Sequence, residues 1–273
     1  MIVVPNVGVL TDEQCAALTA YVEAGGRLVV TGESSLYDEW GDRRDDFALA
    51  GLLGVRHQGK RLEAGKVDWE TYDAHTYLRI EDRAIADGLG DTDVLPFGGQ
   101  LEVVEAARPA VTYVPPFPIY PPELSWMTEP RTDVPAVVLG ERTAYLAADL
   151  DRLYARYHHP DHGRVLANLV RWAAQGDIPL QVDGAGVLDC EIYRQGDATV
   201  LHLVNLDQGG AWRGRLEEFT PAGPFAVRLK ANGRRARFLV AGGEAEVNGR
   251  DGWITVEVAR IADHEVVVFD EKE

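Results

Sequence analysis

The chain has 273 residues, 27 basic and 44 acidic side chains, a formal net charge of −17 and 46% hydrophobic residues. This length suits one large or two ordinary domains, and the composition predicts no membrane span, signal peptide or bulk disorder. No stretch collects enough positive charge to follow a phosphate backbone, which argues against nucleic acid and anionic membrane as partners. The two cysteines, Cys15 and Cys190, are far apart and suggest no disulfide framework, so we expect a reduced, cytoplasmic protein.

The first 31 residues predict a βαβ unit. Ile2-Val3-Val4 is an apolar run typical of a buried strand, and we expect it to be central in its sheet. Thr11 followed by Gln14 predicts a capping box at the start of a helix, and Gly25-Gly26 predicts the end of that helix. Residues 27–31 form a second apolar strand. Since the crossover in such a unit joins parallel strands, we expect an α/β domain with a parallel sheet.

The middle of the chain has weaker periodicity. A second helix is expected from Asp46 to Gly54, and strands are expected at Thr76–Ile80 and Gln100–Val104. Tyr113–Pro122 has five prolines in ten residues, which excludes a helix or a central strand and predicts an ordered loop. The pattern does not determine the fold of residues 56–135 as a whole.

Regular patterns return near residue 136. Apolar runs at 136–139 and 143–147 predict a hairpin, and a helix is expected from Asp161, as its N-cap, to Gly176. From Leu180 onward, short apolar runs alternate with turn residues, which predicts an antiparallel β-sandwich. The expected strands are Val187–Tyr193, Thr199–Asn205, Phe225–Lys230, Arg235–Val240, Gly252–Val258 and Glu265–Phe269. We therefore predict an α/β domain at 1–178 and a β-sandwich at 179–273.

The α/β domain has few parallel strands for its class. Only two precede the irregular middle, whereas doubly wound sheets usually have about five or more strands. The opening strands of such a sheet are therefore expected to be missing. Either the chain is one piece of a longer polypeptide, or another subunit covers the exposed sheet edge, because an open edge invites aggregation.

Several segments resemble a known family. IVVPNVGVLTDEQCAALTAYVEAGGRLVVTGESSLYDEWGDRRDDFALAGLLGV, at residues 2–55, resembles the middle of the β-galactosidase trimerisation domain of family 42 glycoside hydrolases and related hypothetical glycosyl hydrolases. The shared features include the strand followed by Pro-Asn, the Gly-Gly turn and the TGE-SS strand exit. YLAADLDRLYAR with HPDHGRVLANLVRWA resembles the end of that domain, and residues 180–270 are similar to the β-sandwich that follows it.

The resemblance implies a flavodoxin-like fold, that of class I glutamine amidotransferases, which holds catalytic barrels together as trimers without amidotransferase chemistry. Such proteins carry a (β/α)₈ barrel with paired catalytic carboxylates upstream, and this chain has no room for one. Galactosidase activity is therefore not expected of this chain. The expected partners are further copies of the chain, with a trimer favoured, and a chain that carries the catalytic barrel.

The strand exit after Val30 reads Thr31-Gly32-Glu33-Ser34-Ser35. Amidotransferases need a cysteine thiolate at such a turn, and no cysteine is present there. A serine nucleophile elbow needs Gly-x-Ser-x-Gly, and the second glycine is missing. We therefore expect no catalytic residue at this turn and interpret Ser34 as a cap or turn residue, with a hydrolase that uses Ser34 as the alternative.

Asp149 and Asp151 flank Leu150 where a strand leaves the sheet. They are candidate binding residues and, in a second interpretation, the two carboxylates that glycoside hydrolysis requires. Arginines close in sequence favour a third interpretation, in which these carboxylates form structural ion pairs. Those arginines are Arg131, Arg142, Arg152 and Arg156.

Phe117, Tyr120 and Trp126 lie on the proline-stiffened loop and directly after it. Their rings are candidates for stacking on sugar rings or for packing against a neighbouring subunit, whereas the simpler alternative is a loop folded onto its own domain. Three aromatic residues of the sandwich are more typical of a core than of a carbohydrate platform: Trp212, Trp253 and Phe238.

The run His158-His159-Pro160-Asp161-His162 contains residue types that bind metals. A proline divides the run, its histidines do not form a helical pair, and Asp161 suits an N-cap. We therefore interpret the run as the solvated start of a helix, and we expect no metal and no cofactor.

Three hypotheses for function follow. The first is a non-catalytic oligomerisation region of a β-galactosidase-related, glycoside-hydrolase-like protein. The second is a carbohydrate-binding module that uses the aromatic loop or a face of the sandwich. The third is a hydrolase that uses Asp149 and Asp151, or Ser34.

Overall fold

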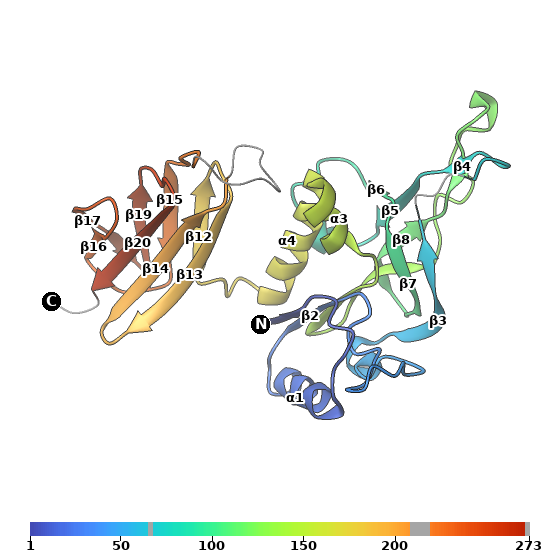
Figure 1. Cartoon of the computed structure of the whole chain (residues 1–273), viewed down its shortest axis with the longest axis horizontal. Coiled ribbons are helices and arrows are strands. Elements are labelled where there is room, and N and C mark those ends of the chain that lie inside the picture. The colour runs from blue at the N-terminus through green and yellow to red at the C-terminus, as the bar shows by residue number, and fades with distance from the viewer. Residues whose placement is uncertain (65–67, 208–218, 271–273) are drawn as a thin grey trace. The chain divides into compact units, whose positions relative to one another are not determined.

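The computed structural model describes residues 1–64, 68–207 and 219–270, so Trp212 lies outside the described residues. The chain divides into unit 1 (Met1–Gly176) and unit 2 (Asp177–Glu273) (Figure 1). Within the described residues, no helix is both long and apolar enough to cross a membrane.

A seven-stranded mixed sheet forms the centre of unit 1. Its strands lie in the order β1 (Ile2–Val4), β2 (Leu28–Thr31), β11 (Thr143–Leu146), β10 (Pro135–Leu139), β8 (Pro109–Val114), β5 (Thr76–Ile80) and β6 (Val94–Phe97). β1, β2 and β11 are parallel, whereas every neighbouring pair from β11 to β6 is antiparallel. The predicted βαβ unit and hairpin are confirmed. The prediction of a parallel sheet is wrong beyond β11. A short hairpin joins β10 to β11 and makes that pair antiparallel, and the pairs formed by β8, β5 and β6 are also antiparallel.

β1 lies at an edge of this sheet and not at its centre, which corrects the prediction. Among the described residues its only strand partner is β2. Ile2 and Val3 are 37% and 42% exposed, and Val4 is buried. An apolar run indicates that a strand prefers burial, but it does not say which element buries the strand.

The α-helices of unit 1 are α1 (Asp12–Glu23), α2 (Ala50–Leu53), α3 (Leu150–Tyr157) and α4 (Pro160–Ala174), and two 3₁₀ helices are η1 (Arg83–Ile85) and η2 (Pro122–Leu124). The predicted capping box of α1 is confirmed. The helix predicted from Asp46 is only the short α2, because Asp46 accepts the N–H groups of Phe47 and His57 and forms a turn instead. Gly54 ends α2 in the left-handed conformation, at φ 67°.

The start of α4 differs from its prediction. His159 is the N-cap and Pro160 the first helical residue, so Asp161 lies within the first turn. Proline suits this position because the N–H that it lacks would have no partner inside the helix.

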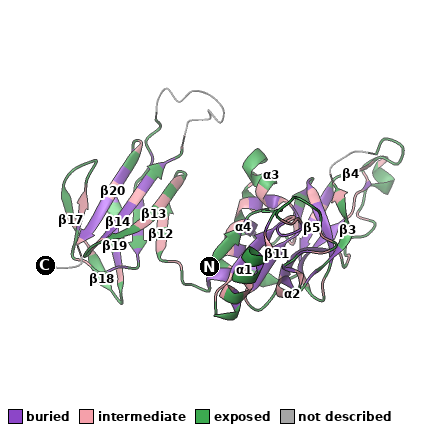
Figure 2. Ribbon diagram, turned by 60° about the horizontal axis from the view of Figure 1, so that its bottom comes forward, coloured by how far each residue is buried: buried purple, intermediate pink, exposed green. Residues whose placement is uncertain are grey.

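Two apolar cores cover the two faces of the seven-stranded sheet. One contains Val29 together with Val165 and Leu169 of α4, and the other contains Leu28 and Val30 together with residues of α1. Successive residues of β2 therefore point to opposite faces, and a helix lies over each face. Figure 2 shows buried residues concentrated in strands such as β11 and β5.

Two small antiparallel pairs complete unit 1: β3 (Arg56–Glu63) with β7 (Gln100–Glu105), and β4 (Asp73–Ala74) with β9 (Phe117–Pro118). The strands predicted at 76–80 and 100–104 correspond to β5 and β7. The proline-rich segment departs from its prediction at one end, because Tyr113 and Val114 finish β8, which pairs with both β10 and β5. The chain leaves the sheet at Pro115, where consecutive prolines supply no N–H groups to the ladder.

Unit 2 is an antiparallel β-sandwich. One sheet contains β12 (Leu180–Gly184), β15 (Phe225–Leu229), β19 (Trp253–Val258) and β18 (Asn248–Arg250). The other contains β13 (Leu188–Gln195), β14 (Ala198–Asn205), β20 (His264–Asp270), β16 (Arg235–Phe238) and β17 (Glu244–Glu246). Apolar side chains of both sheets share one core, on which Phe238 packs, and Figure 2 shows buried residues in β14 and β20. Trp253 is half-buried, with the guanidinium of Arg228 4.4 Å from its ring centroid.

Candidate functional site

Polar residues at the carboxyl ends of the three parallel strands line a cavity of about 300 Å³ in unit 1. Asn6 follows β1, Gly32 and Glu33 follow β2, and Asp149 and Asp151 follow β11. The carboxyl ends of parallel strands are where open α/β sheets usually bind ligands, which makes this cavity the candidate site of unit 1. The other lining residues are Arg61, Gln100, Glu102, Ala147 and Arg152.

Glu102 is the buried centre of an ion network at this cavity. Its carboxylate accepts hydrogen bonds from Arg61 Nε and from His57 Nε2, the latter at 3.1 Å, and Arg61 also pairs with Glu33. His57 Nδ1 accepts the N–H of Gly59 at 2.9 Å, which assigns the ring proton to Nε2. Desolvation lowers the pKa of Arg61, but the hydrogen bond and the charge of Glu102 outweigh it, so the pKa is raised.

Asp149, which follows β11, is also fixed by hydrogen bonds. It accepts the N–H of Gln100 at 2.8 Å and Nε–H of Arg152 at 2.7 Å. Burial raises the pKa of Asp149, and the bonds from Arg152 and Gln100 offset only part of that shift.

Asp151 is held in the same way, by the hydroxyl of Thr31 at 2.6 Å and the N–H of Arg152 at 2.8 Å. Of the four arginines expected near these two aspartates, Arg152 is the one that the described contacts place on them. The other three have different partners: Glu81 for Arg131, the carbonyl of Gly25 for Arg142 and the ring of Tyr157 for Arg156.

The lining includes four carboxylates and two guanidinium groups. Glycoside hydrolysis needs one carboxyl group that gives a proton and a second that acts as base or nucleophile. Burial favours the protonated form of Asp149, but each of the four carboxylates already accepts a hydrogen bond from a protein group. These hydrogen bonds and ion pairs therefore connect the ends of β2 and β11 to β3 and β7, which is the role expected of structural ion pairs.

Ser34 is fully buried beneath the strand exit. Its hydroxyl accepts the N–H of Val7 at 2.9 Å and donates to the carbonyl of Thr31 at 2.7 Å. A serine nucleophile needs a neighbouring general base, whereas the partners of this hydroxyl are backbone groups. Ser34 thus joins the segment after β1 to the end of β2.

The histidine run is the start of α4, as predicted, and it is solvated only in part: His158 and Pro160 are exposed, whereas His162 is buried against β6. Nε2 of His162 bonds to the carbonyl of Pro96 at 2.8 Å, and the rings of His159 and His162 lie 4.8 Å apart. Burial lowers the pKa of His162. Within residues 1–64, 68–207 and 219–270, no group of three or more His, Cys, Asp or Glu side chains could hold a metal ion.

The aromatic residues of the proline-rich segment do not form one platform. Phe117 is buried and its ring stacks on Tyr77 with centroids 5.9 Å apart. Tyr120 and Trp126 are exposed, and the ring of Tyr120 contacts that of Tyr72 at 5.5 Å. The hydrogen bond from the N–H of Ile119 to the carbonyl of Tyr72 places the two segments side by side.

These segments project from unit 1 as an arm around β4 and β9 (Figure 1). We call its exposed residues the aromatic arm: Trp69, Tyr72, Tyr120, Leu124 and Trp126. Trp69 and Trp126 are 75% and 54% exposed. Trp69 and Tyr72 were not predicted to belong to this arm, because no local pattern shows that β4 pairs with β9.

The cavity residues Arg61 and Glu102 were missed for the same reason, since the pairing of β3 with β7 joins distant segments. The place of Glu33 at the cavity could have been predicted from the sequence. Glu33 directly follows an apolar strand in a βαβ unit, and residues at the carboxyl ends of parallel strands lie close together.

No family model and no curated protein sequence matches the chain. Its fold is similar to that of α-L-fucosidase isoenzyme 2 from Paenibacillus thiaminolyticus, with a TM-score of 0.74 and 17% identity over 99% of this chain and 40% of that one. A β-galactosidase from Bacillus circulans sp. alkalophilus has a TM-score of 0.61 and 11% identity over 98% and 32%. A GH42 β-galactosidase from G. stearothermophilus has a TM-score of 0.59 and 13% identity over 98% and 31%.

The chain therefore spans 31–40% of the length of these three solved structures. At 11–17% identity the likeness concerns the fold alone. The chain has the fold of one part of these glycoside hydrolases, with an α/β unit followed by a β-sandwich.

Proposed function

We propose that this chain is a non-catalytic association region of a β-galactosidase-related protein and that unit 1 holds copies together as a trimer. In this proposal unit 1 is an amidotransferase-like trimerisation domain, and the catalytic barrel lies elsewhere, on the same polypeptide or on a partner chain. The alignment of nearly the whole chain with 31–40% of three glycoside hydrolases supports this assignment. A cytoplasmic location, where Cys15 and Cys190 stay reduced, is part of the proposal.

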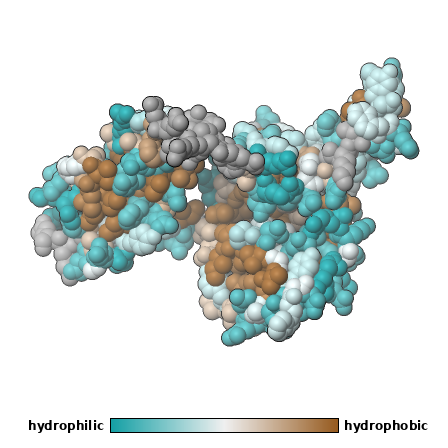
Figure 3. All heavy atoms as spheres, viewed as in Figure 1, coloured by the Kyte–Doolittle hydropathy of each residue, from teal (hydrophilic) through white to brown (hydrophobic). Residues whose placement is uncertain are grey.

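The observation that carries the proposal is that unit 1 exposes two separate apolar surfaces. One is the aromatic arm. The other, the N-terminal edge, consists of Ile2, Val3, Val7 and Val9, and Figure 3 shows an apolar patch over this segment. Extended apolar patches on a soluble fold mark interaction sites.

The N-terminal edge also lacks the protection that edge strands usually have. β6, at the other edge of the same sheet, contains Pro96, which has no N–H to offer to a neighbouring strand. β1 consists of Ile2, Val3 and Val4, with no charge and no proline. Such an edge pairs readily with another chain.

Two different surfaces support the proposed trimer, because they allow a closed ring. A closed ring of three copies needs a heterologous contact, in which each copy offers one surface to one neighbour and a different surface to the other. The N-terminal edge and the aromatic arm lie on opposite sides of unit 1 (Figure 1). The occupant of each surface is therefore a second copy of this chain.

Light scattering coupled to size-exclusion chromatography tests this proposal. The chain should have the mass of three 30.0 kDa copies. An edge variant (Val3→Lys with Val9→Lys) and an arm variant (Trp69→Ser with Trp126→Ser) should each be monomeric, because a closed ring uses both surfaces. Mixed together they should form a 1:1 dimer, because the intact arm of one variant fits the intact edge of the other.

Val187→Lys, at an exposed valine of unit 2, is the matched control and should remain trimeric. A wild-type chain that is monomeric at every concentration would refute association. If only the edge variant dissociates, the contact is isologous at β1 and the arm has another role.

A carbohydrate-binding module is the second candidate, because Tyr120 and Trp126 are 59% and 54% exposed and aromatic side chains can pack on sugar rings. Tryptophan fluorescence titrated with galactosides and plant oligosaccharides separates it from association, since flat titration curves remove this candidate. A hydrolase that uses Asp149 and Asp151, or Ser34, is tested on chromogenic glycosides and esters. Activity that is lost in Asp149→Asn or Ser34→Ala would replace the association proposal.

A further inference from the structure

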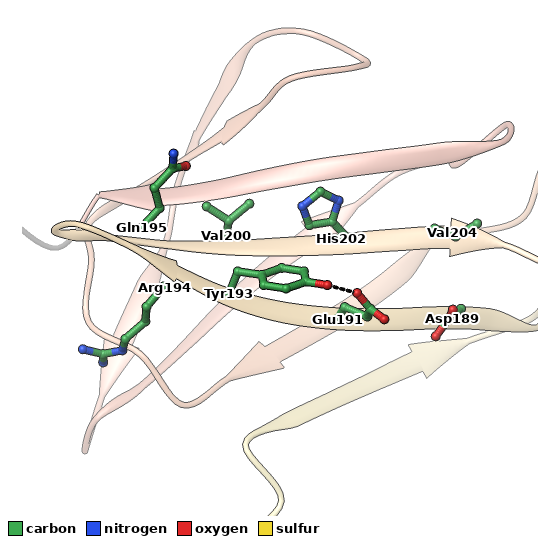
Figure 4. Close-up of a pocket in the computed structure, with 8 residues that line it drawn as sticks. All are labelled: Asp189, Glu191, Tyr193, Arg194, Gln195, Val200, His202 and Val204. Carbon is green, nitrogen blue, oxygen red and sulfur yellow. Dashed lines mark hydrogen bonds between the residues drawn. The ribbon is translucent and has the colours of Figure 1, made fainter.

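Unit 2 has a hollow of about 590 Å³ on the outer face of its five-stranded sheet. Side chains alternate between the two faces of β13, so three of its residues point away from the core. In the register of β13 with β14, one residue of β14 lies opposite each of these three (Figure 4). The pairs are Asp189 with Val204, Glu191 with His202, and Tyr193 with Val200.

Tyr193 forms the main apolar wall of this hollow and is 51% exposed. Its ring meets that of His202 edge to face, with centroids 5.4 Å apart and planes at 86°. Its hydroxyl donates a hydrogen bond to the carboxylate of Glu191, and Figure 4 shows the ring lying along the strand toward that residue. This hydrogen bond also raises the pKa of Tyr193, so the hydroxyl remains a donor at neutral pH. The ring therefore has two contacts that fix its orientation.

The floor and rim of the hollow differ in chemistry. Val200 lies opposite Tyr193 on β14 and is buried, and Val204 is exposed farther along β14, which makes this strand the aliphatic floor. Asp189 and Glu191 place two carboxylates along the rim on β13. The guanidinium of Arg194 and the amide of Gln195 lie at the end of β13 and complete the lining. The hollow thus offers an aromatic face, an aliphatic floor and hydrogen-bonding groups of which two are carboxylates and one is a cation.

A ligand for this surface needs an apolar face and several hydrogen-bond donors. A neutral ligand is favoured over an anion, because the carboxylates of Asp189 and Glu191 outnumber the single lining guanidinium, that of Arg194. The pyranose ring of a neutral sugar meets each requirement, since its C–H groups gather on one face and its hydroxyls surround them. Aromatic rings pack on such C–H faces, and carboxylates form charge-assisted hydrogen bonds with hydroxyls.

We propose that the outer face of β13 and β14 binds a neutral pyranose, with Tyr193 stacked on the C–H face and Glu191 accepting hydrogen bonds from the hydroxyls. His202 holds the ring of Tyr193 in place as a positioning residue. Asp189 lies two residues farther along the same face of β13 and receives the hydroxyls of a second sugar unit. The site lies entirely within unit 2 and does not depend on association through unit 1.

Isothermal titration calorimetry of the full chain tests the site. The neutral probes are methyl glucopyranoside, methyl galactopyranoside and cellotetraose, and the charged probes are glucuronate and trilysine. At least one neutral probe should bind, and glucuronate should bind at least about tenfold more weakly because of charge repulsion.

Variants then locate the binding. Tyr193→Ala should weaken it about tenfold through loss of stacking. Glu191→Gln should weaken it about fivefold, because neutral hydrogen bonds replace charge-assisted ones. Tyr157→Ala removes another exposed tyrosine, on α3 of unit 1, and is the matched control that should leave affinity unchanged.

Three results would overturn the site. They are no binding of any neutral probe at millimolar concentration, binding that both Tyr193→Ala and Glu191→Gln leave unchanged, and tighter binding of trilysine than of every saccharide. Circular dichroism of each variant shows that it is folded. Should Tyr193→Ala unfold unit 2, Glu191→Gln and Asp189→Asn decide, because both preserve side-chain shape.

Discussion

Replacement of Glu102 tests whether the ion network holds the strand ends of unit 1 together. In Glu102→Ala, the buried His57 Nε2–H loses its acceptor, and an unsatisfied buried donor costs about 1–3 kcal/mol. Loss of the ion pair between Glu102 and Arg61 adds less than about 1 kcal/mol to this cost, because the Arg61 side chain is 33% exposed and still pairs with Glu33. We expect a total loss of about 3 kcal/mol in the free energy of unfolding of unit 1.

Glu102→Gln separates hydrogen bonding from charge. The amide oxygen still accepts from His57, so this variant should lose only about 1 kcal/mol. For a unit of 176 residues, each kcal/mol shifts the melting temperature by about 2–4 °C, which predicts roughly 6–12 °C for Glu102→Ala.

Differential scanning calorimetry and urea denaturation measure both variants. Glu105→Ala, at an exposed glutamate on the same strand β7, is the matched control and should change stability by less than about 0.5 kcal/mol. The proposed role of Glu102 is refuted if Glu102→Ala changes the free energy of unfolding no more than this control does. It is also refuted if Glu102→Gln loses as much stability as Glu102→Ala.

Two further predictions concern the same unit. Gly32→Ala should cost about 3 kcal/mol in urea denaturation, because Gly32 has φ 58° and an added Cβ would lie 2.3 Å from Asn6 Oδ1. Gly54→Ala, at φ 67° with no atom within 4 Å, should cost only about 1 kcal/mol, and equal costs would contradict the role of that contact. Burial lowers the pKa of His162 below its ordinary value of 6.5, so the unfolded chain binds the proton more readily. Stability should therefore decrease as pH falls below 6.5 and level off below the folded pKa. His162→Gln should flatten this dependence of the urea midpoint, and an unchanged slope would disprove it.

Much of the first βαβ unit could be predicted from local sequence. The capping box at Thr11, the glycines after α1 and the apolar run of β2 act over neighbouring residues, so a short window contains all of the relevant interactions. The same holds for the hairpin of β10 and β11. The edge position of β1 was not predictable in this way, because it depends on which strand lies beside it.

The candidate cavity was predictable in part. Asp149 and Asp151 follow a strand end, and that position indicates a place at the carboxyl edge of a sheet. Their hydrogen-bond partners lie in distant parts of the sequence, because Gln100 belongs to β7 and Thr31 ends β2. These segments are far apart in the sequence, so no short stretch of sequence indicates that they pair.

Local sequence encodes the α/β unit followed by strands, the helix caps, and the alternation that leaves Glu191 and Tyr193 on one face of β13. These features follow from periodicity and local hydrogen bonding. The mixed sheet, the position of β1 at its edge among the described residues, and the link from His57 through Glu102 to Arg61 arise only in the folded chain. The physical reason is that burial and ion pairing depend on side chains brought together from distant segments, and local propensity carries no information about those partners.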